Sequence, residues 1–576
     1  MKNKIDYIVT FEYWKTDIFF DKATRDELSA LDQVADAKEI EDRFYRELDF
    51  GTGGLRGIMG AGTNRMNKYT VGKATKGLAD YLLATYGQEA CRERGVVIGY
   101  DTRNNSKFFS ETVANVLSST GIKVYLHSHA RPTPQLSFSV KFWNAIAGVV
   151  ITASHNPKEY NGYKIYDEFG CQLVPWQAKQ VIKYVDTVTD YKTIDFTGER
   201  SLIQMGDVTD NFINAVLKQS RNNNKTVKEN LHVIYTPLHG TGNVPVTKTL
   251  LLDGFTHLDH VDAQVVPNGD FPTVVSPNPE DKRALLLGID QAERTGADIV
   301  LGTDPDCDRV GVAVKTEDGY QLVTGNQIGA LLIDYVLSHT DLSKIDNPAV
   351  VKTIVTSELG AEIARKKGLT VFSTLTGFKF IGEKITQFER ARAEGDGDRN
   401  YTFVLGYEES YGYLAGTHAM DKDAVVSNML ICEMAAEYKA AGKTLLDRMD
   451  EIYIEYGYYR DALDSFTLKG KDGLEDISSM MSSLRASPSP FENTADTIDY
   501  SKSVYAEPGF GHLPTSNVLK YILADGSWIA IRPSGTEPKI KIYYSIKSDN
   551  RDAAEKKLES IQKTITGQLG LTRTGL

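Results

Sequence analysis

The feature that most constrains the fold of this chain is a strand–helix pattern that occurs three times before residue 411. Each copy reads strand, helix, strand, helix, strand, and a polar loop follows its third strand. Strands that alternate with helices are typical of parallel βαβ units, whose crossovers are right-handed. We therefore predict three similar mixed α/β domains, each of which presents one polar loop to a shared central cleft.

The predicted elements of the first copy are strand 96–100, helix 110–119, strand 122–126, helix 134–142 and strand 145–151. Those of the second copy are strand 231–235, helix 244–252, strand 263–266, helix 282–294 and strand 299–301. Those of the third copy are strand 350–355, helix 358–366, strand 370–372, helix 380–388 and strand 402–405.

The segments outside the repeat differ from it. Residues 1–50 show helical spacing, and 50–67 form a Gly-rich loop with Arg56 and Arg65. Glycine allows close backbone approach to an anion and arginine offers a forked partner for phosphate, although a flexible turn is the alternative. After residue 455 a Ser/Pro-rich, linker-like stretch (483–490), two strands and an amphipathic helix predict a smaller α+β domain. The predicted domains are 1–205, 206–322, 323–455 and 456–576.

Composition narrows the class of protein. Four cysteines without paired spacing argue against disulfides and zinc, and favour a reducing compartment. They are Cys91, Cys171, Cys307 and Cys432. The net charge of −12 disfavours nonspecific nucleic-acid binding. The charged N-terminus lacks the apolar core of a signal peptide, and no apolar run approaches the roughly 18 residues of a membrane span. We expect a soluble cytoplasmic protein that binds neither nucleic acid nor membrane.

The apolar run 145–151 ends in a loop that presents Ser154 and His155. Pro157 cannot donate to a sheet ladder, so the strand should end before it. A serine hydroxyl at the end of a buried strand lies where open α/β sheets place their chemistry. An ordinary turn is the alternative, because Ser, Asn and Pro are favoured in turns for backbone reasons alone.

The loop TDPDCDR carries Asp304, Asp306 and Asp308 after the third strand of the second copy. Each like-charge pair at about 4 Å would cost about 4 kcal/mol at an effective dielectric of about 20, so three ionised aspartates need a cation. Oxygen-only ligands favour Mg²⁺ or Mn²⁺. A calcium EF-hand is excluded because Arg309 and Lys315 occupy its glycine and glutamate positions. Three surface aspartates in a turn are the remaining alternative.

Two further loops carry polar side chains. GYEES presents Glu408 and Ser410 at a strand end, which suits sugar hydroxyls, with a solvated acidic loop as the alternative. RPSGTEPK offers the guanidinium, hydroxyls and backbone amides of a phosphate cradle, and a simple turn would not require so many donors. Its candidate residues are Arg532, Ser534, Gly535 and Thr536. The other candidates for substrate binding are Thr376, Gly377 and Lys379, in the loop TLTGFKFIG.

Four stretches of the chain resemble the four signature loops of the α-D-phosphohexomutases. In chain order they are TASHNP with NGYK, DPDCDR, YEES and RPSGTEP. The chain is most similar to the longer bacterial phosphoglucomutase branch, and the resemblance covers nearly its whole length. It implies an isomerase that interconverts glucose 1-phosphate and glucose 6-phosphate through a phosphoserine and glucose 1,6-bisphosphate. Tyr407 stands where many members carry glycine, and phosphomannomutase and phosphopentomutase activities remain alternatives on the same scaffold.

The same resemblance implies the residue roles. Ser154 is the phosphorylated serine, and Asp304, Asp306 and Asp308 bind Mg²⁺ together with a phosphate oxygen on Ser154. The residues around the transferring phosphoryl group are Arg56, His155, Lys164 and Arg309. Lys422 is the candidate acid/base lysine, Glu408 and Ser410 contact sugar hydroxyls, and the Arg532 loop holds the nonreacting phosphate. We expect a monomer or weak dimer.

Two other readings of these residues are weaker. A haloacid-dehalogenase-like phosphotransferase would use Asp304 as nucleophile, but its D-x-D motif usually follows the first strand rather than the third. A nonenzymatic phosphosugar sensor would have no use for a serine that faces a three-aspartate metal site.

Overall fold

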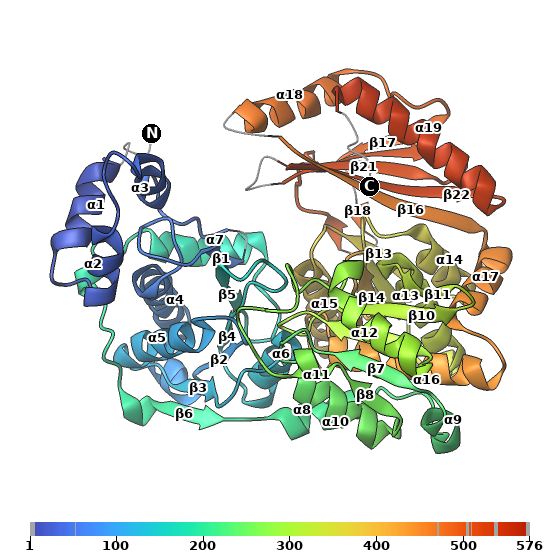
Figure 1. Ribbon diagram of the computed structural model, residues 1–576, viewed down its shortest axis with the longest axis horizontal. Coiled ribbons are helices and arrows are strands. Elements are labelled where there is room, and N and C mark those ends of the chain that lie inside the picture. The colour runs from blue at the N-terminus through green and yellow to red at the C-terminus, as the bar shows by residue number, and fades with distance from the viewer. Residues whose placement is uncertain are drawn as a thin grey trace. The chain divides into compact units, whose positions relative to one another are not determined.

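The computed structural model describes residues 6–51, 53–468, 472–502, 506–507, 510–534 and 539–571 (Figure 1). The chain forms two compact units. The first comprises Met1–Leu322 and Gly412–Glu437, and the second comprises Val323–Tyr411 and Tyr438–Leu576. None of the helices in the described ranges combines the length and the apolar character that a membrane span requires.

Two mixed sheets form the frame of the first unit, with strand orders β1-β5-β4-β2-β3-β6 and β11-β10-β9-β7-β8. In both, the first strand of the repeat lies between the second and the third and is parallel to each. The strands of the first sheet are β1 Gly54–Ile58, β2 Val96–Tyr100, β3 Val124–His127, β4 Ala147–Ile151, β5 Tyr160–Tyr166 and β6 Ile203–Gly206. Those of the second are β7 Val233–Thr236, β8 Leu258–His260, β9 Ile299–Thr303, β10 Val310–Thr316 and β11 Gly319–Val323.

Helices cover both sheets of the first unit. Those of the first sheet are α4 Lys68–Glu93, α5 Ser106–Ser119, α6 Thr133–Phe142 and α7 Pro175–Val185. Those of the second are α8 Thr209–Leu217, α9 Lys225–Glu229, α10 Asn243–Asp253, α11 Asp262–Val265 and α12 Lys282–Thr295. Three N-terminal helices, α1 Tyr7–Thr16, α2 Lys22–Ser29 and α3 Ala37–Phe44, pack around a core that includes Phe11 and Trp14. The segment Gly412–Glu437 adds β15 Gly412–Ala415 and most of α16 Ala424–Ala440.

Two sequence predictions for the first unit are wrong in detail. Residues 263–266 are not a strand, because 262–265 form helix α11 and the strand of this position is β8. A four-residue apolar run has no usable periodicity, and the pairing of Leu258 with Val233 decides which residues join the sheet. The Gly-rich stretch 50–67 is not entirely loop, because its centre forms β1, antiparallel to β5.

The second unit contains the third copy of the repeat, with β13, β12 and β14 side by side and both pairs parallel. This is the strand order of the other two parallel cores, so the predicted set of three similar α/β domains is confirmed. The strands are β12 Pro348–Thr353, β13 Thr370–Thr374 and β14 Thr402–Glu408. The helices are α13 Gly325–Ser338, α14 Glu358–Lys366, α15 Phe378–Glu394 and α17 Leu445–Tyr456.

The chain ends in an antiparallel sheet of order β16-β22-β21-β20-β17, one face of which is covered by two helices (Figure 1). The strands are β16 Tyr458–Thr467, β17 Thr494–Asp499, β20 Leu519–Leu523, β21 Trp528–Pro533 and β22 Lys539–Ser548, and the helices are α18 Asp472–Ala486 and α19 Arg551–Leu569. A short hairpin, β18 Ala506–Glu507 and β19 Gly511–His512, precedes β20. The predicted α+β architecture of this part is confirmed.

The Ser/Pro-rich stretch 483–490 is not a linker between domains. Strand β16 precedes it and pairs with β22 over its full length, from Tyr458↔Ser548 to Thr467↔Lys539. The stretch therefore lies inside the last domain, where it ends α18 and leads toward β17. Serine and proline appear there because they end a helix, not because they separate two cores.

Candidate active site

Ser154 lies three residues beyond β4, is 4% exposed and has a backbone φ of +51°. A left-handed conformation in a residue other than glycine is uncommon and costs about 1 kcal/mol or more. Such strain persists only where the surrounding contacts determine the conformation, and it is often found at functional sites. The contacts that hold this loop are therefore informative.

A buried network formed by Asp101, Arg103 and Thr152 holds the serine loop. Arg103 donates to the carbonyl oxygens of Ser154 (3.2 Å from Nε), Pro157 (3.0 Å) and Tyr160 (3.2 Å). Thr152 donates to Asp101 (2.6 Å) and accepts from the backbone N–H of Ser154 (2.8 Å). Sequence reasoning missed Asp101 and Arg103, although they directly follow β2 and an inspection of every strand end would have found them.

Arg103 is a positioning residue, and this role can be tested. Lysine keeps the charge but cannot fork to several carbonyl oxygens, so Arg103→Lys should loosen the serine loop. We expect kcat to fall about 10- to 100-fold, because a displacement of about 1 Å at a reacting group has an effect of this size, while KM changes little. Steady-state kinetics and a melting curve measure both. The exposed Arg92→Lys is the control, and an unchanged kcat in Arg103→Lys would contradict the role.

The three aspartates lie together after β9. Asp304, Asp306 and Asp308 are at most 1% exposed, and each offers a carboxylate oxygen within 4.8 Å of the others. The Ser154 hydroxyl donates to Asp304 Oδ2 at 2.7 Å. The loop of the first sheet and the loop of the second therefore meet at the serine hydroxyl.

The environment of this triad fits a metal ion. Asp306 Oδ1 and Asp308 Oδ1 are buried and, within the described part of the chain, have no hydrogen-bond partner. Burial, with repulsion from Asp306, raises the pKa of both Asp304 and Asp308, whereas Lys164 and neighbouring donors hold the pKa of Asp306 below its ordinary value despite burial. Buried carboxylates that repel one another, two of them with unsatisfied oxygens, fit the oxygen ligand set of a hard cation.

Two predicted lysines lie at the triad. Lys164, from β5, is 3.2 Å from Asp306 Oδ2 and 4.0 Å from Asp308 Oδ2. Lys422, from the loop before α16, is 2.8 Å from Asp308 Oδ2. Both amino groups therefore lie beside the carboxylates of the triad.

His155 and Arg56 lie on the serine side of the site. His155 Nδ1 is 3.2 Å from Ser154 Oγ. Burial, together with Arg309 and Arg56, holds the pKa of His155 well below its ordinary value, so the imidazole is neutral near pH 7. Arg56, on β1 opposite Gly162 of β5, donates to Asn156 Oδ1 at 3.4 Å.

Three more residues support the aspartate loop. Thr133, the first residue of α6, donates its hydroxyl to Asp306 Oδ2 (3.0 Å) and its N–H to the carbonyl oxygen of Asp306 (2.9 Å). Arg309 donates its backbone N–H to Asp304 Oδ1 (3.1 Å), and its side chain forms an ion pair with Glu280. Sequence reasoning missed Thr133, which meets Asp306 only when two sheets pack together, and Glu280, which is 29 residues from Arg309 in the chain.

The second unit brings the predicted sugar loop and its neighbour together. Glu408, 4% exposed at the end of β14, accepts from the backbone N–H of Gly377 at 3.0 Å. The hydroxyl of Thr376 is buried and has no hydrogen-bond partner within the described ranges, so it has a donor and an acceptor to offer. Lys379 follows on the first turn of α15, and Ser410 follows Glu408 in the loop.

Tyr407 points away from this loop. The side chain is fully buried, and its hydroxyl donates to the carbonyl oxygen of Ser357 at 3.3 Å. A Cβ at Gly329 or Gly360 would lie 2.4 or 2.5 Å from the Tyr407 side chain, so both glycines make room for the ring. The Tyr407 side chain is therefore part of the packing of the domain core rather than of the sugar loop.

Only part of the predicted phosphate loop lies within the described residues. Arg532 is on β21, opposite Lys541 of β22, and the backbone N–H of Ser534 donates to the carbonyl oxygen of Lys539 at 2.7 Å. Gly535 and Thr536, which were also predicted to bind phosphate, lie outside the described residues.

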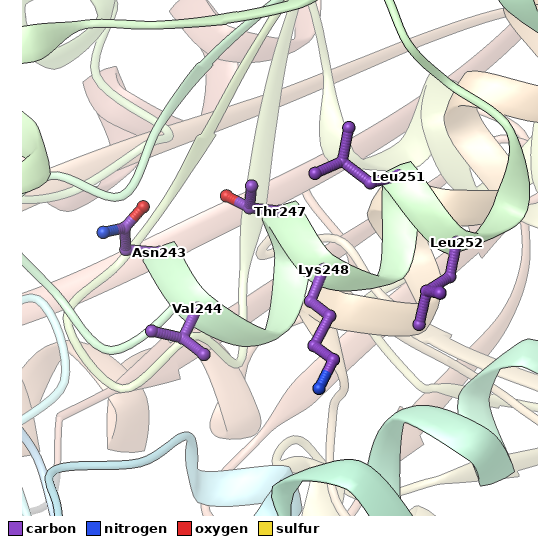
Figure 2. A pocket seen from close by; sticks show the side chains of 6 residues that line it. All are labelled: Asn243, Val244, Thr247, Lys248, Leu251 and Leu252. Atoms are coloured by element: carbon purple, nitrogen blue, oxygen red, sulfur yellow. The ribbon is translucent and has the colours of Figure 1, made fainter.

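A pocket of about 450 Å³ on α10 is a poor alternative site (Figure 2). It is lined by Asn243, Val244, Thr247, Lys248, Leu251 and Leu252. All six side chains come from one helix, and the only charged one, Lys248, forms an ion pair with Asp210 at 2.6 Å. Catalytic sites gather polar groups from several elements, as the aspartate loop does and this pocket does not.

Comparison with known proteins identifies the family. The four phosphoglucomutase/phosphomannomutase models match in chain order: α/β/α domain I over residues 47–192, domain II over 210–319, domain III over 324–456 and the C-terminal domain over 486–559. The phosphoglucomutase of Staphylococcus aureus strain USA300 is 38% identical over 542 residues, which cover 91% of this chain and 94% of that protein.

Solved structures share the fold. A phosphoglucomutase from Paramecium, pp63/parafusin in its open form, matches with a TM-score of 0.68 at 18% identity and covers 92% of this chain and 96% of its own. A putative phosphomannomutase from Thermus thermophilus matches with a TM-score of 0.65 at 22% identity, and the match covers 91% of this chain and 100% of that chain. With its four domains matched in order and a relative at 38% identity over nearly its whole length, the chain belongs to the phosphoglucomutase/phosphomannomutase family of α-D-phosphohexomutases.

Proposed function

We propose that this protein is a phosphoglucomutase, which interconverts glucose 1-phosphate and glucose 6-phosphate through glucose 1,6-bisphosphate. The observation that supports this most directly is the contact between the Ser154 hydroxyl and Asp304 Oδ2, 2.7 Å, inside a buried set of three aspartates. Family membership and the phosphoglucomutase relative agree with it. We also propose that the protein is cytoplasmic and works as a monomer or weak dimer.

Asp304, Asp306 and Asp308 would hold Mg²⁺ together with a phosphate oxygen on Ser154, since hard cations prefer oxygen ligands. When bound, the ion neutralises charge on the transferring phosphoryl group. A phosphoserine carries about −1.5 to −2 charge near neutral pH, so the chain's own cations matter as well. Lys164 and the arginines Arg56 and Arg309 supply that charge.

In the first half-reaction, the bond between phosphorus and Ser154 Oγ breaks as a hydroxyl oxygen of the sugar monophosphate bonds to phosphorus. The proton of that hydroxyl passes to a base, for which Lys422 is the candidate, 2.8 Å from Asp308 Oδ2. The bisphosphate then turns over, and its other phosphoryl group returns to Ser154 Oγ. His155 is neutral and lies 3.2 Å from that oxygen, so it orients Ser154 Oγ in both half-reactions.

Substrate recognition is assigned to the second unit. Glu408 and Ser410 read the sugar hydroxyls, with Thr376, Gly377 and Lys379 beside them. Arg532, Ser534, Gly535 and Thr536 hold the phosphate that does not react. We propose that the domains end near residues 205, 322 and 455.

Turnover of a panel of sugar 1-phosphates tests the proposed function. The purified protein is supplied with Mg²⁺ and a trace of glucose 1,6-bisphosphate, and the 6-phosphate product is measured for glucose and mannose, with ribose 1-phosphate tested for conversion to the 5-phosphate. We expect glucose 1-phosphate to have the highest kcat/KM. Faster turnover of mannose or ribose phosphate would replace the proposed specificity, and no turnover of any of the three would reject the mutase.

Glu408 and Arg532 should have separable effects. Glu408→Gln removes a charged acceptor for sugar hydroxyls, so the ratio of kcat/KM for glucose to that for mannose phosphate should change by about tenfold or more. Arg532→Ala should lower both values alike, because each substrate loses the same charge-assisted bonds to phosphate. The ratio of kcat/KM for glucose phosphate to kcat/KM for mannose phosphate is measured for both variants and for the wild type. An unchanged ratio in Glu408→Gln would show that Glu408 does not discriminate between the two sugars.

A further inference from the structure

A second group of metal-ligating side chains lies on the second sheet of the first unit. Val233 of β7 pairs with Leu258 of the parallel edge strand β8. Paired residues share a face of the sheet and alternate residues share a face along a strand. His232, His257 and Asp259 therefore lie on one face, opposite to the face that Val233 and Leu258 occupy. The register alone gathers two imidazoles and a carboxylate.

The side chains meet as the register requires. Each of the three offers a ligand atom within 4.8 Å of the others. His232 Nε2 is 2.8 Å from Asp259 Oδ2, and the His232 and His257 rings are stacked with centroids 3.6 Å apart. His232 is buried, Asp259 is half-buried and His257 is exposed, so solvent and ions reach the group from the His257 side.

We propose that His232, His257 and Asp259 form a binding site for a divalent transition-metal ion of the zinc type. Two imidazoles and one carboxylate are a ligand set that Zn²⁺ accepts, and water completes a tetrahedral site. Mg²⁺ is not the expected ion, because it prefers oxygen ligands and keeps its waters. The ion would take the place of the hydrogen bond between His232 Nε2 and Asp259 Oδ2.

Binding requires a small rearrangement. Ring nitrogen lone pairs lie in the ring plane, and the two rings are within 9° of parallel, so both cannot point at one ion as they stand. His257 is exposed and can rotate, whereas buried His232 stays in place. The His232–Asp259 pair must open from 2.8 Å to about 3.3 Å, the separation of two ligands in a tetrahedral site with bonds of about 2.0 Å.

This site is separate from the aspartate triad. His232 precedes β7, and the triad follows the carboxyl end of β9, which is parallel to β7 with Val233 opposite Ile299. The two groups are thus at opposite ends of the sheet, roughly 15 Å apart over about five strand residues. A metal at His232 would clamp the three-residue edge strand β8 to β7 rather than take part in phosphoryl transfer.

Zinc binding to the full-length protein tests the proposal. Calorimetric titration with Zn²⁺ is done in the presence of saturating Mg²⁺, which occupies the aspartates. The wild type should bind one Zn²⁺, and His257→Ala and Asp259→Asn should each bind it at least about tenfold more weakly, because a ligand is lost. Mutase activity in Mg²⁺ should stay unchanged in both variants.

The matched control is His129→Ala. His129 is 67% exposed and lies 3.7 Å from Asp207, so it is a surface histidine beside a carboxylate. This variant should bind Zn²⁺ as the wild type does. Equal affinity in the wild type and His257→Ala would overturn the proposal. Loss of Zn²⁺ binding in Asp306→Asn would also overturn the proposal, because the ion would then occupy the catalytic aspartates. The measurement is of binding, so its outcome does not depend on the proposed mutase activity.

Discussion

Replacing Ser154 with alanine should lower kcat for sugar-phosphate interconversion by about four orders of magnitude or more, since removal of a catalytic nucleophile has effects of this size. The physical reason is that the variant has no oxygen to accept or return the phosphoryl group next to Asp304. The alanine fits the same loop, which Arg103 and Thr152 hold through the backbone, so the melting temperature should change little. Coupled steady-state kinetics measures the loss.

The exposed Ser201→Ala is the matched control and should keep full activity. Labelling adds a second readout: protein incubated with a phosphosugar should carry an acid-stable phosphate on the peptide that contains Ser154. A phosphate released by hydroxylamine, on the peptide that contains Asp304, would instead establish an acyl-phosphate mechanism. Activity retained in Ser154→Ala would lead to the same conclusion.

Asp306→Asn should lower the rate by about two orders of magnitude at limiting Mg²⁺, because the metal loses one anionic ligand. The effect should shrink as the Mg²⁺ concentration rises, since weaker binding is partly offset by mass action. The amide oxygen of the new side chain can still accept from the Thr133 hydroxyl, which limits structural damage. Activity is followed across a Mg²⁺ titration for the wild type and the variant.

Asp290→Asn, an exposed substitution on α12, removes the same charge far from the triad and should behave as the wild type. If Asp306→Asn matched the wild type at every Mg²⁺ concentration, the three aspartates would not be the metal site.

The sequence was sufficient for the features that depend on local pattern. Strand ends are predictable because apolar runs stop at polar loops, so the positions of Ser154 and of the aspartates on their strands follow from the sequence. Their contact does not, because the 2.7 Å bond to Asp304 depends on how two separate sheets pack. The same holds for Thr133, because the residues next to it in the sequence do not indicate its hydrogen bond to Asp306.

The errors have equally specific causes. Residues 263–266 were too few for their periodicity to separate strand from helix, and the pairing of Leu258 with Val233 decided the outcome. The stretch 483–490 has a linker's composition, but β16 had already begun the last domain. Tyr407 could not be interpreted from the sequence, because only the fold reveals Gly329 and Gly360 against its ring.

The discontinuity of the first unit has a consequence for synthesis on the ribosome. Lys422 belongs to the segment Gly412–Glu437, which joins the first unit only after Val323–Tyr411 has been made for the second. About 270 residues separate Ser154 from Lys422, which at about 5–20 residues per second takes roughly 15–50 s. During that interval a nascent chain has its serine and then its aspartates, but not the lysine that pairs with Asp308.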